Sequence, residues 1–103
     1  MTRSKKNIDL AEFLIEADPE VCKSVLKTAN SNFIKFVGEV AVNILLENIK
    51  VTDHFLNKLR HYSKVIRDLG SKRIKHKRRQ KLCVENHRVV QLMLKASISH
   101  LKD

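Results

Sequence analysis

A chain of 103 residues that is 43% hydrophobic, with Gly 2 and Pro 1, is the right size for one domain and is poor in turn-forming residues. A sheet-rich fold needs Gly and Pro at its many turns, so their scarcity favours long helices. Lys+Arg 21 against Asp+Glu 11 gives a formal net charge of +10, which attracts phosphate or acidic partners. We expect a single all-α domain over residues 1–103, a compact bundle of four to five short helices.

Residues 1–51 are expected to supply the apolar half of the bundle. Asp18 is a good N-cap, with Pro19 at the first helical position, for a helix that follows a short first one. Ser31 can cap a further helix, and residues 34–45 carry apolar side chains at helical spacing. This segment is the most hydrophobic one, and we place it at the centre of the core.

The second half begins with a helix expected over residues 52–69. Thr52 is a good N-cap, and Gly70 stands where the residue after a helix often takes the left-handed conformation. Tyr62 falls at the edge of the apolar sector, so we expect it to pack in the core rather than to stand free as a stacking platform. The opposite side of this helix is cationic.

Two more helical segments are expected before the end of the chain. Ser71 can cap a segment over residues 72–82 that has few apolar anchors and is therefore weakly held. Asn86 can cap a last helix in which apolar residues from Val90 to Leu101 line one side. No internal repeat, low-complexity linker or domain boundary interrupts the chain.

Positive charge is confined to the second half of the chain. Residues 1–51 hold seven Lys or Arg and seven Asp or Glu, whereas residues 52–103 hold fourteen basic and four acidic residues. Such asymmetry points to a nucleic acid or another anionic partner more strongly than the total charge does.

The basic run from Lys58 to Lys81 is the strongest functional signal. It contains eleven Lys or Arg and one acid, Asp68, and an ordinary solvated face would mix both signs. Lys and Arg bind phosphate oxygens, so we predict that the run follows a phosphate backbone and releases its counterions. The expected nucleic-acid-binding residues are Lys58, Arg60, Lys64, Arg67, Lys72, Arg73, Lys75, Lys77, Arg78, Arg79 and Lys81.

Recognition of base sequence is not expected. The cationic faces carry few Asn or Gln side chains to read adenine, so contacts to the backbone of duplex DNA are the preferred mode. RNA remains an alternative, because phosphate contacts alone do not separate the two nucleic acids. A second alternative is an interaction adaptor that docks an acidic protein and receives a partner helix on its apolar stripes. The apolar half could also self-associate, and the cluster in 72–81 also resembles a nuclear localisation signal.

Other classes of site have little support in the residues. Cys83 and His87 share the spacing of one metal-ligand pair, but a structural zinc site needs two such pairs, so we expect no metal. Neither a glycine-rich phosphate loop nor a clear catalytic group is present, and we expect no enzyme, no cofactor and no small-molecule substrate. A lipid surface is also not expected, because the basic helix over 72–81 carries a single bulky apolar residue, Ile74.

The expected location is intracellular and most readily nuclear. Cys22 and Cys83 are too few for a disulfide framework and are expected to be reduced. Residues 1–6 are followed by no apolar stretch long enough for a signal peptide, so secretion is not expected. The most apolar run, residues 40–46, is far below the roughly 20 residues of a membrane span.

Four segments carry a resemblance to a known family. Residues 41–52, 58–61, 65–69 and 72–82 resemble the small basic proteins encoded by Polinton (Maverick) elements and by the related adenovirus-like adintoviruses of animals. The similarity covers about residues 20–84 and lies in helix pattern and charge.

The resemblance implies a virion or element-encoded protein that accompanies the genome, comparable to the small basic core proteins of adenoviruses. Family members tend to follow the basic run with Gly-Gly and an apolar tail, whereas residues 84–87 here read Val-Glu-Asn-His, so proteolytic maturation is not implied and a diverged or host-adopted copy fits. By position, the shared basic residues are Lys58, Arg60, Arg67, Lys72, Arg73, Lys75, Lys77, Arg78, Arg79 and Lys81.

Overall fold

The computed structural model describes residues 4–102 and confirms the all-α class. Within that range the chain forms seven α-helices and no strand, so the expected number of four to five was too low. Residues 1–3 and Asp103 lie outside the described residues. Residues 1–3 belong to the N-terminal stretch in which no signal peptide was expected. The helices are α1 (Lys5–Glu16), α2 (Pro19–Thr28), α3 (Ser31–Leu45), α4 (Asp53–Arg60), α5 (Ser63–Gly70), α6 (His76–Glu85) and α7 (His87–Lys102).

The segment expected as one helix over 52–69 is broken in the middle. α4 ends at Arg60, and the N–H groups of His61 and Tyr62 donate to the carbonyls three residues back, at Lys58 and Leu59, which tightens the turn. α4 packs against α7, whereas α5 packs against α3. The break lets the two short helices pack against different neighbours. The periodicity of apolar residues in the sequence contains no information about these tertiary contacts, so it did not predict the break.

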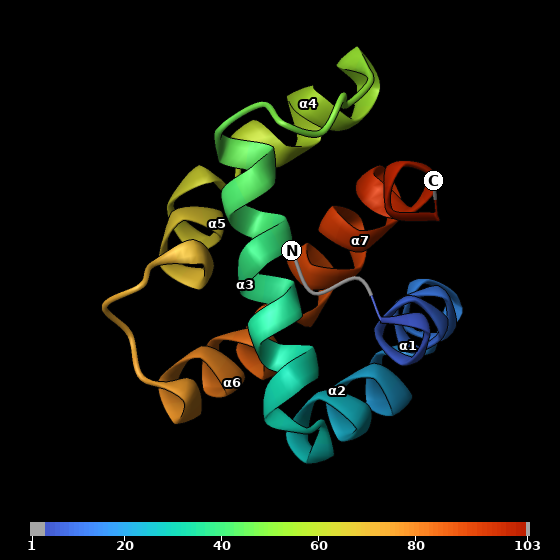
Figure 1. Ribbon diagram of the computed structural model, residues 1–103, viewed down its shortest axis with the longest axis vertical. Helices are drawn as coiled ribbons and strands as arrows, with labels where there is room; N and C mark the ends of the chain where they lie inside the picture. The colour runs from blue at the N-terminus through green and yellow to red at the C-terminus, as the bar shows by residue number, and fades with distance from the viewer. Residues whose placement is uncertain (1–3, 103) are drawn as a thin grey trace.

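The connection between α5 and α6 was assigned wrongly. Gly70 is the last residue of α5 and has a negative φ, so it is no left-handed C′ residue. Ser71 follows it as the C-cap, and its hydroxyl accepts from the N–H of Arg73 within a turn instead of starting a helix. α6 begins only at His76, and residues 71–75 arch away from the other helices (Figure 1).

The starts of α2 and α3 were predicted to within one residue, with the cap of α3 misassigned, whereas no start was predicted for α1. Ser4 accepts from the N–H of Asn7 at the start of α1. Pro19 occupies the first turn of α2 as expected, although Asp18 makes no side-chain capping hydrogen bond. Asn30, not Ser31, caps α3, since its Oδ1 accepts from the N–H of Phe33 at 2.9 Å.

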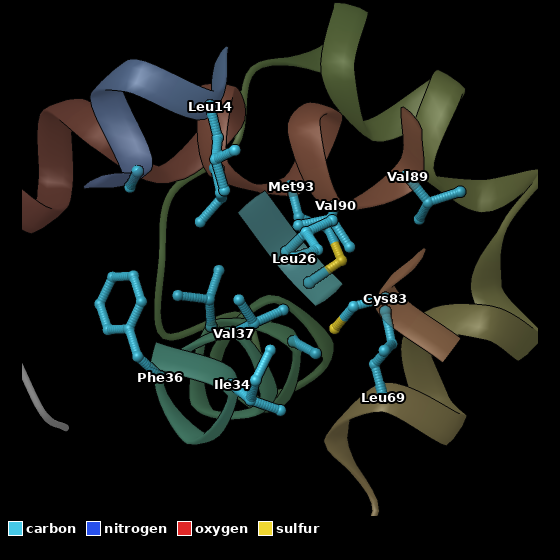
Figure 2. Close-up of a cluster of buried hydrophobic side chains, with 14 of the residues drawn as sticks. Leu14, Leu26, Ile34, Phe36, Val37, Leu69, Cys83, Val89, Val90 and Met93 are labelled. Atoms are coloured by element: carbon cyan, nitrogen blue, oxygen red, sulfur yellow. The ribbon is translucent and has the colours of Figure 1, made fainter. Parts of the chain in front are cut away.

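Helix α3 runs through the middle of the molecule, as its hydrophobicity predicted (Figure 1). α5 and α6 lie on one side of it and α7 with α1 on the other (Figure 1). Ile34, Val37 and Val40 are buried in one hydrophobic cluster with side chains of α1, α2, α5, α6 and α7 (Figure 2). Leu45, expected in the same stripe, is exposed because it lies beyond these neighbours at the end of α3.

Both glycines of the chain lie where α3 crosses α5. A Cβ on Gly38 would come within 2.9 Å of the Arg79 Nε and 3.1 Å of the Leu69 carbonyl oxygen. A Cβ on Gly70 would come within 3.0 Å of Val42 Cγ2. A glycine inside a helix costs roughly 1 kcal/mol relative to alanine, and here the close helix crossing accounts for it.

The last helix begins where it was predicted. Val90, Met93, Leu94, Ser97 and Leu101 are buried along one side of α7, as the periodicity indicated. Asn86 directly precedes α7, as expected, and its carbonyl accepts from the N–H of Val90 at 3.1 Å. Its side chain instead donates to the carbonyl of Leu82 at 3.0 Å, at the end of α6.

Two glutamines of the late helices close the C-terminal ends of early ones. The Nε2 of Gln80 in α6 donates to the Leu26 carbonyl at 2.9 Å, across 54 residues of chain. The Nε2 of Gln91 in α7 donates to the carbonyls of Leu14 at 2.8 Å and Ala17 at 2.9 Å. The last carbonyls of a helix have no intrahelical partner, so these contacts complete α2 and α1 while fixing them to the late helices.

Candidate nucleic-acid interface

The predicted basic residues are at the surface with one exception. Arg79 is half-buried, and every other one is exposed. None of them forms an ion pair with a carboxylate among residues 4–102, where the ion pairs are Lys23–Glu20 and Lys102–Glu12. The exposed set consists of Lys58, Arg60, Lys64, Arg67, Lys72, Arg73, Lys75, Lys77, Arg78 and Lys81.

The larger part of this set follows α5, the arch and α6 in succession. On α5, Ile66 and Leu69 are buried against α3, and Lys64 and Arg67 lie exposed on the opposite side. The arch carries Lys72, Arg73 and Lys75, all exposed, and leads directly to the outer side of α6. We call the exposed side chains of Lys64, Arg67, Lys72, Arg73, Lys75, Lys77, Arg78 and Lys81 the α5–α6 basic face.

Helix α6 begins without the groups that usually stabilise a helix N-terminus. Its N-cap is Lys75, which makes no side-chain capping hydrogen bond, and its first turn has no acidic residue. Lys77 and Arg78 instead add positive charge to the positive end of the helix dipole, an arrangement that is electrostatically unfavourable for the protein alone. An anion near this helix start would relieve the repulsion.

Arg79 has a structural role that sets it apart from the basic residues around it. Its Nε donates to the Leu69 carbonyl at 2.9 Å and its Nη2 to the Ser71 carbonyl at 2.6 Å. These are the open carbonyls at the end of α5, so the guanidinium completes that helix and ties α6 to it. Two of its N–H groups are therefore used within the protein, and the phosphate binding predicted for Arg79 would fall to its remaining N–H groups.

Lys58 and Arg60 on α4 do not share one surface. They are two residues apart and so point about 200° apart around the helix axis. Lys58 lines a hollow of about 340 Å³ together with His61, Tyr62, Arg88 and Leu92. Arg60 lies exposed on the other flank of α4.

Two residues of this hollow were misjudged from the sequence. Tyr62 was expected in the core but is 44% exposed, because the break between α4 and α5 turns it outward. Arg88 was not selected because it lies outside the run from 58 to 81. Arg88 lies in the first turn of α7, where a cation is unfavourable for the helix. This unfavourable placement was the sequence feature that could have marked Arg88 as a candidate binding residue.

A second hollow lies beside the α5–α6 basic face. It measures about 530 Å³ and is lined by Lys35, Lys72 and Arg79 together with Glu39 and both glycines. The Glu39 carboxylate on its wall offsets part of the positive charge, and two N–H groups of Arg79 already donate to the carbonyls of Leu69 and Ser71.

Cys83 cannot supply a nucleophile at neutral pH. Its side chain is fully buried and points into the core cluster (Figure 2). Burial raises the pKa of the Cys83 thiol to about 12, only partly opposed by the Arg79 charge, so the thiol stays protonated. In the described part of the chain no three His, Cys, Asp or Glu side chains are grouped as a metal would require.

Comparison of the chain with protein families, curated proteins and solved structures finds no match. Among the helices of residues 4–102, none has both the length and the apolar character that crossing a membrane demands.

Proposed function

We propose that the protein binds duplex DNA through the phosphate backbone, without reading base sequence, and that it helps to coat or package the DNA. The observation that carries this proposal is the α5–α6 basic face, whose side chains are exposed and form no ion pair with a described carboxylate. Exposed cations on two consecutive helices and on the arch between them could bind a row of phosphates.

The fold beneath the face supports the proposal. Arg79 fixes α6 to the end of α5, so the arch is held at both ends and presents its cations in a defined arrangement. The uncompensated start of α6 adds backbone N–H groups that could donate to a phosphate. The face consists of Lys and Arg alone, without the Asn or Gln side chains that read adenine, and we expect its cations to contact phosphates, so no sequence preference is expected.

The resemblance to small basic proteins of Polinton elements and adintoviruses is part of the same proposal. A genome-coating role would place the protein in the nucleus, or in a virion if a virus encodes it. The DNA-binding proposal itself depends on the basic face and not on this origin.

Binding to random-sequence duplex DNA, RNA and heparin at rising salt tests the proposal. We expect sub-micromolar affinity for DNA at low salt and no dependence on sequence. If about six phosphates are contacted, log K should fall with log salt at a slope near −5. No binding to DNA at about 50 mM salt would overturn the proposal, because phosphate contacts are strongest at low salt.

A matched pair of variants separates the basic face from net charge. Changing Lys75, Lys77, Arg78 and Lys81 together to Gln should abolish DNA binding and leave the far-ultraviolet helix signal intact, since all four are exposed. Arg79 is kept, because α5 depends on it. The control replaces the exposed Lys5, Lys6, Lys27 and Lys50 by Gln and removes the same charge. Equal loss of binding in both variants would show that total charge, not the face, binds DNA.

An interaction adaptor is the second candidate, supported by a separate surface. Leu46, at the end of α3, is 65% exposed, and Leu45 beside it is also exposed. A hollow of about 360 Å³ nearby has four apolar and two charged lining residues: Ile44, Ile49, Val51, Leu56, Glu47 and Lys50. Large exposed apolar side chains around a hollow are typical of protein-binding surfaces.

A further inference from the structure

The hollow at the break between α4 and α5 combines an exposed aromatic ring with positive charge. The Tyr62 N–H donates to the Leu59 carbonyl at 2.9 Å, so its backbone is fixed by the turn. In the described part of the chain no hydrogen bond holds its hydroxyl, and the side chain is 44% exposed. An exposed aromatic ring on a backbone that is fixed in this way is a surface on which a nucleobase can stack.

The charges around this ring have one sign. Lys58 comes from α4 and Arg88 from the first turn of α7, and no carboxylate lines the hollow. His61 adds a ring that can donate a hydrogen bond. The two cations converge from different helices because α4 packs against α7. They could bind the phosphate of a nucleotide whose base lies on Tyr62.

Size and composition favour this hollow over the larger one beside the basic face. Its volume of about 340 Å³ is at the lower end of small-ligand sites, which suits a single nucleotide. The larger hollow has no aromatic residue, has Glu39 on its wall, and includes an arginine whose N–H groups are already used. Leu92 gives the smaller hollow an apolar wall as well.

We propose that this hollow binds one unpaired nucleotide, with the base stacked on Tyr62 and the phosphate between Lys58 and Arg88. The nucleotide could be free or could belong to a strand. Its occurrence at the end or gap of a DNA duplex rests on the proposed function, whereas binding of a free nucleotide does not. A DNA duplex with a single-stranded overhang should then bind more tightly than a blunt one of equal length.

The composition of the chain makes the free nucleotide easy to test. Tyr62 is the only tyrosine, so selective tyrosine labelling yields the ring signals of this residue alone in an NMR spectrum. Adenosine 5′-monophosphate should shift these signals upfield through the ring current of the stacked base. Ribose 5-phosphate, which carries the phosphate but no base, should not. Ring signals unmoved by saturating nucleotide would overturn the proposal.

Variants extend the test to strands. Tyr62→Ala should lower affinity for the overhang duplex about tenfold and leave affinity for the blunt duplex unchanged, since stacking on one base is of that magnitude. Tyr62→Phe, which keeps the ring, should bind like the parent chain. Equal binding of the overhang duplex by the parent and Tyr62→Ala would overturn the strand form of the proposal.

The two proposals fail in different ways. Loss of all duplex binding with the nucleotide shift intact would overturn the proposed function alone. Duplex binding with an unmoved Tyr62 ring would overturn only the nucleotide site. Tyr62→Ala is not expected to unfold the chain, because Tyr62 is 44% exposed and lies outside the hydrophobic core, and its backbone hydrogen bond remains.

Discussion

Glu47 is the one residue other than glycine with a positive φ among residues 4–102, at 58°. It follows the C-cap of α3, and its N–H donates to the Ile44 carbonyl while the N–H of Asn48 donates to the Asn43 carbonyl. This pair of hydrogen bonds is the Schellman motif, which usually has glycine at the left-handed position. The side chain of Asn48 adds a hydrogen bond to Asn43 Oδ1 at 3.1 Å.

Replacing Glu47 by glycine should stabilise the protein. A side chain in the left-handed region costs roughly 1 to 2 kcal/mol, partly offset by the greater freedom of glycine in the unfolded chain. We expect a gain of about 1 kcal/mol, or about 4 to 8 °C in Tm, measured by circular dichroism during heating. Lys35→Gly, at an exposed position inside α3, is the control and should lower Tm. A fall of Tm in both variants would contradict this account of Glu47.

Individual side chains were predictable where local chemistry leaves one choice. Pro19 marks the first turn of α2 because its ring suits that position and few others. Asn30, Ser31 and Asn32 can all cap a helix, and the cap falls on Asn30 because the chain turns there. Tyr62 fits the apolar periodicity of a continuous helix, so its exposure follows only from the break between α4 and α5.

At the level of helices, the basic run hides one residue that differs from its neighbours. In a helix that starts at His76, Arg79 falls between Leu82 and Cys83 on the inner side. Lys77, Arg78 and Lys81 fall on the outer side. The helix expected from residue 72 did not distinguish Arg79 from its neighbours. Phosphate binding was therefore predicted for all of these cations alike.

Arg79 and Arg78 should therefore respond differently to the same substitution. Arg79→Met removes two hydrogen bonds from a charged donor to the end of α5, and we expect a loss of about 1.5 to 3 kcal/mol in the free energy of unfolding. Arg78→Met changes an exposed side chain and should stay within about 0.5 kcal/mol of the parent chain. Urea unfolding measures both. Equal losses would contradict the capping role of Arg79.

Considered as a whole, the molecule has much charge and few ion pairs. The formal net charge is +10, and the ion pairs of residues 4–102 are Lys23–Glu20 and Lys102–Glu12. Both involve exposed side chains, and such pairs contribute little to stability. Repulsion among the cations of the second half is therefore the larger electrostatic effect.

Salt should stabilise the protein. Between about 20 mM and 0.5 M sodium chloride the Debye length shortens severalfold, so repulsion within the basic face is screened. We expect Tm to rise with salt in a thermal unfolding series. The variant with Lys75, Lys77, Arg78 and Lys81 changed to Gln should show a smaller rise. A fall of Tm with salt would contradict this account, because it would mean that attraction between opposite charges outweighs repulsion among the cations.

The fold class was predictable because composition and periodicity act over the whole chain, while the number of helices was not. The expected number of four or five helices was too low, and one of the additional helices arises because the segment expected over 52–69 is broken into α4 and α5, which pack against different neighbours. The candidate interface was likewise predicted as a region, from charge of one sign. The hollow around Tyr62 and Arg88 was not, because it joins residues of α4 and α7 that are far apart in the sequence.

Three helices are completed by donors that come later in the chain: α1 by Gln91, α2 by Gln80 and α5 by Arg79. A ribosome therefore synthesises each of these helices with its final carbonyls still open to water. For α1 and α2 the closing donors lie more than fifty residues further on, so these helices emerge long before their ends can be closed. Their native ends should thus form only once α6 and α7 have emerged, rather than helix by helix as the chain is made.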